Sequence, residues 1–337
     1  MKKKYLPIFV LLFLTTGCGY FRGAEKVPET PKPEEIINEV PSGEEVEGGV
    51  QINEEGTKYI VNPEKLYVAG PPKDGIPAIN EPKFVTVEEA NEWIQDSELV
   101  LAIDYKGVKR AYPLQIMIWH EIINDVVAGD PLVITYCPLC GSGIAFERTI
   151  DGEPVEFGTS GQLYNSNLVM YDRKTDTLWT QATGQAIVGA LSGRELTSVS
   201  IDTVVWKDWK KTYPDSEVLS KDTGYIRAYG EDPYASYYED SFLFFPVESR
   251  DDSVHPKTVV FGIKVNGKYK AYQESDLKKT PVILDEIDGV SIHIERSENG
   301  IITVTNQNTK EEVLKERMFW FSWYAFHPDT QLYKREK

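Results

Sequence analysis

An internal repeat constrains the fold of this 337-residue chain more than any short motif. Residues 99–136, "LVLAIDYKGVKRAYPLQIMIWHEIINDVVAGDPLVITY", align without a gap with residues 259–296, "VVFGIKVNGKYKAYQESDLKKTPVILDEIDGVSIHIER". The two segments share 9 identities in 38 positions, and their glycines and apolar residues coincide. A pattern repeated at a fixed separation indicates a repeated structural unit, so we expect two related lobes.

Each copy carries the signals of a β-hairpin followed by another strand. An apolar run leads to Lys106-Gly107 or Asn266-Gly267, and a return run ends in Ala-Tyr. Asn-Gly between two such runs is a strong hairpin signal, and Lys-Gly occupies the same place in the first copy. After a second glycine, strands are predicted over 132–136 and 291–295.

Few segments have helical signals. Thr86 is a predicted N-cap for a helix over 87–95, because Glu88 and Glu89 then lie in its first turn. A second helix is predicted over 203–212, before Pro214. The remaining runs are short, strand-like and separated by turn residues. The predicted fold class is therefore α+β, β-dominated, with a few short helices.

The N-terminus has the pattern of a secretory signal. Three lysines and a short apolar run precede Cys18, and this run is too short to span a bilayer stably. We predict a signal peptide over 1–17. Gly17-Cys18 resembles a bacterial lipoprotein processing site, although Thr15 stands where Leu is more usual, so a signal with an incidental cysteine is the alternative. Both alternatives predict an extracytoplasmic protein, and the first anchors it to the membrane through lipid on Cys18.

Composition divides the rest of the chain. Residues 18–57 are acidic and rich in Pro, Glu and Gly, which predicts a disordered tether. Residues 58–337 are predicted to be globular, with lobe one at about 83–200 and lobe two at about 255–337. The formal charge of −17 becomes −20 once the three lysines of the signal are removed, which excludes nucleic acid as a natural partner. A protein or small-molecule partner is left open.

The repeat also separates scaffold residues from candidate site residues. Residues shared by both copies serve the common backbone, whereas those found in one copy are free to carry chemistry. Four such residues of copy one have no counterpart in copy two: His120 aligns with Thr280, Glu121 with Pro281, Cys137 with Ser297 and Cys140 with Gly300. We therefore expect the site in copy one.

The pair Cys137 and Cys140 has three interpretations. A disulfide across so short a loop adds only about 2 kcal/mol of stability, so a purely structural role is weakly motivated. Neighbouring thiols also exchange electrons or share a soft metal ion. The following "GSGIAFER" indicates a strand, which argues against a thioredoxin fold. Structural zinc needs four ligands, and the sequence has no second Cys pair and no His pair at zinc-ligand spacing. A metal site would therefore use Cys137, Cys140 and His120 with an open or fourth position, and copper(I) or zinc as the ion.

Other polar residues are candidates for a pocket. "WHEIIND" lacks the second histidine of the His-Glu-x-x-His zinc pattern, but a helix there would place His120 and Asn124 on one face, with Glu121 beside them. Ser160 and Asn165 fall in a Ser/Asn-rich stretch, where turn hydrogen bonds are the alternative. Asp172 and Arg173 begin a predicted hairpin turn, where an ion pair is the alternative. The aromatic run 318–326 suits either a core or a binding platform.

Three blocks together resemble a known family. "RAYPLQIMIWHEIINDVVAGDPLVITYCPLCGSGIAFER", "FGTSGQLYNSNLVMYDRKTDTLWTQATGQAIVG" and "FWFSWYAFHPDTQLY" are similar to the uncharacterised prokaryotic family catalogued as domain of unknown function 3179. The resemblance covers about 85–333 and implies no activity. The sequence thus leaves three hypotheses: soft metal binding, thiol-disulfide chemistry, and a solute- or partner-binding lipoprotein with a structural disulfide.

Overall fold

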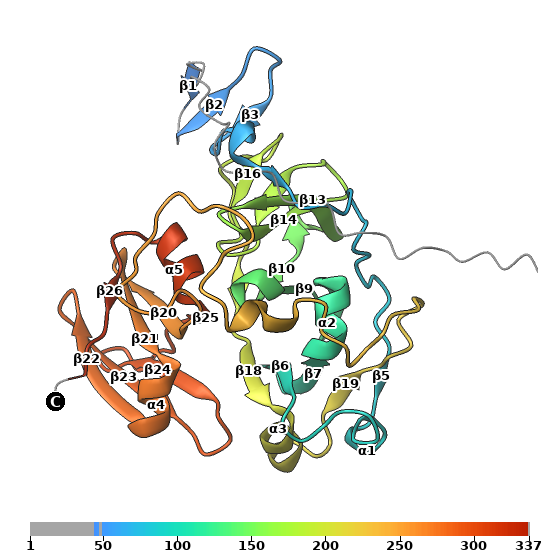
Figure 1. The fold of residues 1–337 in the computed structure, drawn as a ribbon, viewed down its shortest axis with the longest axis vertical. Coiled ribbons are helices and arrows are strands. Elements are labelled where there is room, and N and C mark those ends of the chain that lie inside the picture. The colour runs from blue at the N-terminus through green and yellow to red at the C-terminus, as the bar shows by residue number, and fades with distance from the viewer. Residues whose placement is uncertain (1–43, 47–48, 336–337) are drawn as a thin grey trace, which may run out of the picture. The chain divides into compact units, whose positions relative to one another are not determined.

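The computed structural model describes residues 44–46 and 49–335, and strands dominate it. The repeat is confirmed element by element, because each unit of copy one recurs 160 residues later (Figure 1). In copy one these are β6 (Leu99–Tyr105), β7 (Val108–Pro113), α2 (Leu114–His120), β8 (Ile122–Val127) and β9 (Asp130–Cys137). In copy two they are β20 (Val259–Val265), β21 (Lys268–Gln273), α4 (Glu274–Lys279), β22 (Val282–Ile287) and β23 (Val290–Arg296).

The hairpin turns explain the glycines that the two copies share. Lys106 and Asn266 both have φ near 49°, and the glycines after them have φ of 86° and 77°. Two successive residues with positive φ suit the twist of a two-residue hairpin loop, and glycine adopts that conformation without steric cost. The predicted hairpins therefore form as expected.

The repeat extends beyond the aligned segment. In each lobe the aligned segment is followed by a third strand of an antiparallel sheet, a strand-helix unit and a short strand that pairs in parallel. Lobe one therefore continues past the expected limit of residue 200. In lobe one these are β10 (Ser142–Glu147), β18 (Asp202–Val205) with α3 (Trp206–Thr212), and β19 (Glu217–Leu219). In lobe two they are β24 (Ile302–Asn306), β25 (Lys315–Phe319) with α5 (Trp320–Phe326), and β26 (Gln331–Leu332).

The sheets of the two lobes have matching orders. Lobe one contains β18-β6-β7-β19-β5, and lobe two contains β25-β20-β21-β26. The meanders are β17-β10-β9-β8 and β22-β23-β24. Short strand β5 (Phe84–Val85) and short strand β17 (Ser198–Val199) occur only in lobe one.

Equivalent tyrosine–aspartate pairs tie each hairpin to its meander. The Tyr112 hydroxyl donates to Asp125 Oδ2 at 2.6 Å, and the Tyr272 hydroxyl donates to Asp285 Oδ2 at 2.7 Å. A basic residue completes each pair, with Arg110 Nη1 2.9 Å from Asp125 and Lys270 Nζ 2.6 Å from Asp285. Residues present in both copies therefore hold the common scaffold together.

Lobe one alone carries a large insertion, residues 148–201, between β10 and β18. Its main hairpins join N-terminal strands in a sheet of order β1-β2-β3-β16-β15-β14-β13-β4 (Figure 1). The insertion strands are β11 (Thr149–Ile150), β12 (Glu153–Pro154), β13 (Phe157–Tyr164), β14 (Asn167–Asp172), β15 (Leu178–Thr180) and β16 (Ala186–Val188). The N-terminal strands are β1 (Glu44–Val46), β2 (Val50–Ile52), β3 (Lys58–Tyr59) and β4 (Tyr67–Val68).

The predicted disordered tether needs a correction at its C-terminal end. Residues 44–46 and 50–52 form paired strands, and β2 also pairs with β3. Val50 and Ile52 are only partly exposed, so two apolar positions in an otherwise polar segment are enough to join an existing sheet. The predicted signal peptide, the rest of the tether to residue 43, and Cys18 lie outside the described residues.

The helices are short. Thr86 caps α1 (Val87–Ala90), and its side chain and that of Glu89 form a capping box. This helix ends earlier than predicted, and turns follow through Ile94. The helix predicted over 203–212 is α3, preceded by strand residues from Asp202 to Val205. Within the described residues, no helix is long and apolar enough to cross a membrane.

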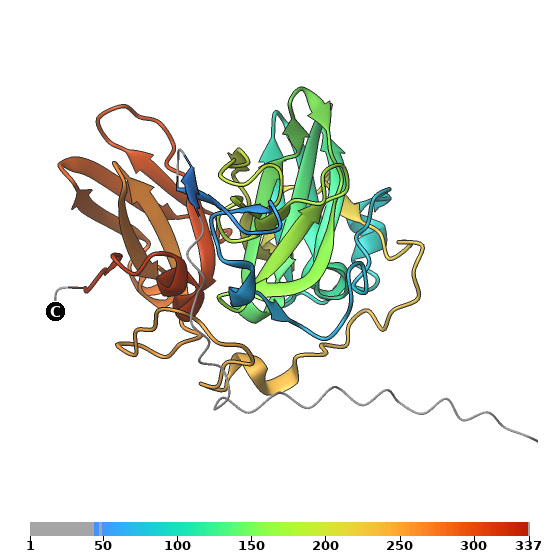
Figure 2. The same ribbon diagram turned by 90° about the horizontal axis from the view of Figure 1, so that it is seen from above.

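Residues 220–258 connect the lobes, and we call them the linking segment. Apart from the short 3-10 helix η3 (Ala235–Tyr238), this segment has no helix or strand, and it is drawn in yellow to orange in Figure 2. Structureless connections of this length are uncommon in compact domains and are usually functional loops. Ile226 on this segment is 97 % exposed.

Candidate functional site

The two thiols lie at the end of a central strand of lobe one. Cys137 ends β9, and Cys140 ends the 3-10 helix η2 (Pro138–Cys140), which Gly141 terminates with φ of 59°. The strand β10 then returns along β9, with Ser142 opposite Cys137. The strand predicted after the thiols is therefore present. Both thiols are free and buried, with 2 % and 0 % of their surface exposed.

A buried amide network from the insertion holds Cys140. Asn167 Nδ2 lies 3.4 Å from Cys140 Sγ and 2.8 Å from Gln181 Oε1. The Gln181 amide also accepts from Ser142 Oγ at 3.0 Å and donates to Thr135 Oγ1 at 3.0 Å. When protonated, Cys140 donates to the Ser166 carbonyl at 3.4 Å. A satisfied network of this kind fixes the geometry around the sulfur.

Glu121 supplies a buried carboxyl beside the thiols. It terminates α2 in the left-handed region with φ of 58°, and its carbonyl accepts from the Tyr136 amide at 2.8 Å. Non-glycine residues rarely adopt this conformation, and such strain is concentrated at functional sites. Burial raises the pKa of Glu121 to about 8, against a hydrogen bond from Tyr234. The group is therefore mostly neutral at pH 7.

The environment separates the two thiols chemically. Burial raises the pKa of Cys137, and the hydrogen bond to Cys140 and the negative charge there raise it further. Burial also opposes ionisation of Cys140, but the neighbouring polar groups of Cys137, Ser322 and Asn167 outweigh that effect and lower its pKa, and Asn167 Nδ2 is the one within hydrogen-bond distance. Ionised Glu121 raises the pKa of both thiols. Cys140 is therefore the sulfur that ionises first.

His120 does not join the thiols as a ligand in this structure. Its Nδ1 lies 2.8 Å from the Pro77 carbonyl, which can only accept, so Nδ1 carries the proton. Burial lowers the pKa of His120, so the ring is neutral and Nε2 accepts from the Tyr229 hydroxyl at 2.6 Å. Within residues 44–46 and 49–335, no three His, Cys, Asp or Glu side chains are grouped to hold an ion.

The linking segment covers the site with tyrosines that the sequence reasoning missed. Besides Tyr229, the Tyr234 hydroxyl lies 3.5 Å from Glu121 Oε1, and the Tyr237 hydroxyl donates to the Leu139 carbonyl at 3.1 Å. Lys257 secures this cover, because it donates to the Asp240 and Phe242 carbonyls and lies 3.6 Å from the Tyr237 ring centroid. The available signal was "YIRAYGEDPYASYY", which is rich in tyrosine although it lacks a strand pattern.

Three of the predicted pocket residues make structural hydrogen bonds instead. Asn124 lies in β8, not on a helical face with His120, because α2 ends at His120 and the β-branched residues after Glu121 continue as a strand. Its amide bonds both backbone polar groups of Phe157. Ser160 donates to the Val169 carbonyl at 2.5 Å in β14. Asn165 joins Ala325 of lobe two to Glu248 of the linking segment.

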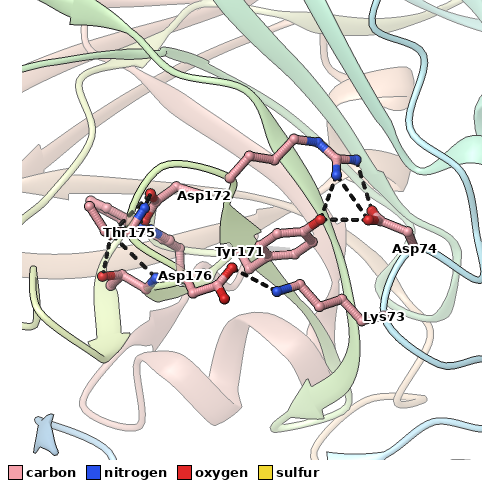
Figure 3. A network of polar contacts seen from close by, with 9 residues as sticks. Lys73, Asp74, Tyr171, Asp172, Thr175 and Asp176 are labelled. Carbon is pink, nitrogen blue, oxygen red and sulfur yellow. Dashed lines mark hydrogen bonds and ion pairs between the residues drawn. The ribbon is translucent and has the colours of Figure 1, made fainter.

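Asp172 and Arg173 belong to a separate polar network, part of which is seen in Figure 3. Asp172 accepts from the Thr175 amide at 2.6 Å and from Trp179 Nε1 at 3.0 Å, which closes the hairpin turn. Arg173 pairs with Asp74 through both terminal nitrogens at 2.9 Å, rather than with Asp172. These two residues therefore stabilise the insertion and do not reach the thiols.

The aromatic run 318–326 packs into the core. Trp320, Phe321 and Trp323 are each 2 % exposed or less. Trp323 lies so close to β20 that a Cβ at Gly262 would be 2.2 Å from its ring. The run also brings Ser322 of lobe two to Cys140. Its contribution to the site is therefore a hydroxyl and a rigid wall, rather than an exposed aromatic platform.

Fold and site together define a two-lobed, β-rich protein with a buried dithiol in its first lobe. The model of the family described as "Protein of unknown function (DUF3179)" matches residues 73–314, so the chain belongs to that family. No curated protein and no solved structure shows a significant match to this chain. Its chemistry must therefore be argued from the site.

Proposed function

We propose that this protein is a thiol-disulfide redox protein whose Cys137–Cys140 pair takes up or gives back two electrons. The observation that carries the proposal is geometric: two free, buried thiols stand three positions apart, and Asn167 Nδ2 lies 3.4 Å from Cys140 Sγ. The directions of the pKa shifts agree with it, since the pKa of Cys140 is lowered and that of Cys137 is raised. Groups whose environments shift their pKa values apart are typical of acid-base and nucleophilic sites. In this scheme Cys140 is the attacking sulfur, and Cys137 is the resolving one.

The reaction is balanced by a disulfide of a second molecule. The Cys140 thiolate attacks one sulfur of that disulfide, and the other sulfur leaves as a thiolate and takes up a proton. Cys137 then loses its proton and attacks Cys140, which forms the intramolecular disulfide and releases the second thiol. Two protein thiols are oxidised and one external disulfide is reduced. Neutral Glu121 supports the step, because an additional negative charge beside the thiols would oppose ionisation of either one.

Soft metal binding is a second candidate with its own supporting observation. Two neighbouring sulfurs in a buried, largely apolar cluster suit an ion that accepts two thiolates. Copper(I) fits this description through its preference for soft ligands. Zinc fits less well, because structural zinc sites normally need four ligands and the ring nitrogens of His120 are already bonded.

The proposed location is the outer face of a membrane. The lysine-rich, apolar N-terminus supports export, and Cys18 supports attachment through a lipid. An extracytoplasmic setting is consistent with dithiol chemistry, because disulfides form and persist there. The location and the redox function are separate proposals and fail separately.

The test uses the full chain with Cys18→Ser, so that only two thiols are present. Reduced protein is treated with neutral hydroxyethyl disulfide, and mass spectrometry follows the product. The expected product has lost two hydrogens, and two small thiols are released per chain. Cys137→Ser should instead stop at a mixed disulfide on Cys140. If the reduced protein forms no intramolecular disulfide, either in the folded state or in denaturant, the redox proposal is overturned.

The same reduced protein separates the two candidates. Anaerobic exposure to copper(I) and to zinc, followed by removal of excess ion, gives the metal-to-protein ratio. A stoichiometric copper ion that resists hydroxyethyl disulfide and disappears in Cys137→Ser would favour the metal function. A protein that retains no ion and oxidises readily would favour the redox function.

A further inference from the structure

A cavity of about 400 Å³ lies next to the thiol pair. Tyr136 and Gly141, the residues flanking the Cys137–Cys140 segment, form part of its wall. The rest comes from lobe one through α2 and the start of β6 with Glu98, from the linking segment through Gly230 to Asp232 with Tyr238, and from lobe two through β25 and the start of β20. The cavity exists only because lobe one, lobe two and the linking segment meet beside the thiols.

Two aromatic rings of the cavity wall lie close to the residue that follows Cys140. The Phe319 ring rests directly on Gly141, where a Cβ would lie 2.8 Å from the ring. Tyr238 lies beside Phe319, with their ring centroids 6.2 Å apart. Both rings also line the cavity. A molecule in the cavity therefore contacts the Phe319 ring, which packs on the residue after Cys140.

Tyr136 presents an unsatisfied polar group at this place. Its side chain is 6 % exposed and lines the cavity, and its hydroxyl has no hydrogen-bond partner in the described part of the chain. Burial raises the pKa of Tyr136, so the hydroxyl stays neutral and can donate. The hydroxyl is not among the buried side-chain atoms that lack a partner, so it is accessible from the cavity that Tyr136 lines. A ligand in the cavity would therefore reach it as a hydrogen-bond partner.

The cavity wall has an excess of negative charge. Glu98, Glu231 and Asp232 line it, and the single lining cation is Arg317 among the described residues. The charge of Arg317 is offset by Glu274, whose Oε1 lies 3.1 Å from Arg317 Nε. Carboxylates that line a cleft attract cationic molecules and raise their local concentration.

From this arrangement we infer that the cavity binds a small cationic disulfide, the oxidant of the dithiol. The inference rests on the proposed redox function and adds the class of co-reactant. The cavity volume is within the range of small-molecule sites, which favours a small molecule over a folded protein. One external disulfide bond breaks and the Cys137–Cys140 bond forms, so the electrons balance without a further reagent.

The experiment compares three probes on the reduced full chain with Cys18→Ser: cationic cystamine, neutral hydroxyethyl disulfide and anionic dithiodipropionate. For each probe we measure the rate at which the dithiol is oxidised. The rate with cystamine is divided by the rate with dithiodipropionate, and this ratio is normalised by the same ratio for free dithiothreitol. We expect a normalised ratio of about 10 or more at low salt, falling towards one as salt screens the charges. Glu231→Gln with Asp232→Asn should lower it several-fold.

A matched control removes the same two charges elsewhere. Glu54→Gln with Glu55→Gln changes two exposed residues that do not line the cavity, and should leave the normalised ratio as in the parent protein. If hydroxyethyl disulfide oxidises the pair but the cavity variant keeps the parent ratio, or the control lowers it equally, the inference is overturned. If none of the probes oxidises the pair, the redox function itself fails.

Discussion

The two lobes share a scaffold but differ in what surrounds it. Copy one and copy two have the same order of elements, the same turn conformations and equivalent Tyr-Asp bonds. Only copy one has the dithiol, the left-handed Glu121 and the insertion that supplies Asn167 and Gln181. At the equivalent positions copy two has Ser297, Gly300 and Pro281. A site has thus been added to one of two similar frames.

The comparison also shows that copy two is part of the site. It contributes Ser322 to the surroundings of Cys140, and Phe319 and Arg317 to the cavity. Copy two therefore supplies one wall of the candidate site in copy one. The linking segment completes the enclosure through Tyr229, Tyr234 and Tyr237.

The largest expected effect concerns the buried carboxyl that only copy one places beside thiols. Because the folded pKa of Glu121 is about 8 and the unfolded pKa is near 4.5, the folded state holds the extra proton between these values. This group therefore makes stability fall as pH rises through that window, by about 1.4 kcal/mol per pH unit. Glu121→Gln should remove this slope, as measured by urea unfolding at several pH values.

A matched variant in lobe two tests the assignment. Burial also raises the pKa of Glu316 to about 8, and Glu316 is not among the main groups that shift the pKa of either thiol. Glu316→Gln should remove a similar slope, but only Glu121→Gln should lower the pH at which the thiolate absorbance appears. Equal effects of both variants on the thiolate would contradict the role assigned to Glu121.

Next in size is a steric difference between equivalent strand positions. Ala102 of β6 corresponds to Gly262 of β20, where the Trp323 ring occupies the space of a Cβ. Gly262→Ala should destabilise the protein by about 3 kcal/mol, as overpacked cores do. Ala102→Gly should cost about 1 kcal/mol through backbone entropy. Thermal unfolding of the two variants measures the difference, and a milder effect of Gly262→Ala would contradict the packing.

The shared Tyr-Asp pairs give a smaller effect in both lobes. Tyr112→Phe should cost about 2 kcal/mol, because it removes a hydrogen bond to a buried carboxylate. Tyr272→Phe should cost about 1 kcal/mol, since the Asp285 side chain is 15 % exposed and that of Asp125 only 4 %. Denaturant unfolding compares them. A change in the thiol redox properties of Tyr112→Phe would show that this pair is more than scaffold.

The smallest effect concerns the cover over the site, which has no counterpart in copy two. Tyr229→Phe removes the hydrogen bond to His120 and should cost about 1 kcal/mol. It should also increase amide exchange in residues 220–235 while leaving β20 to β23 protected, as measured by hydrogen exchange. Unchanged exchange in the linking segment would mean that the His120–Tyr229 bond does not hold the cover.

Much of the scaffold could be predicted because its signals are local. The Asn266-Gly267 turn, the Thr86 capping box and the gapless repeat each specify structure through residues close in sequence. The repeat also predicted copy one as the place of the candidate site before any contact was known. By contrast, the end of α2 at His120 was missed, since no local signal favours a left-handed conformation at Glu121.

The site itself depends on contacts between distant segments. Asn167, Gln181, Tyr234 and Ser322 reach the thiols from the insertion, the linking segment and lobe two. None of these residues has a motif around it, so polar candidates nearer in sequence, such as Ser160 and Asp172, were equally plausible. Those two proved to bond their own hairpins.

The most direct test of the proposed thiol-disulfide function is the reduction potential of the Cys137–Cys140 pair. It is measured by equilibrating the full chain, with Cys18→Ser, in buffers of defined thiol-disulfide ratio and quantifying the oxidised form by mass. For a redox function we expect a reversible potential between about −180 and −270 mV, as in known dithiol redox proteins. A potential below about −300 mV would identify an inert structural disulfide and contradict the redox function of the pair.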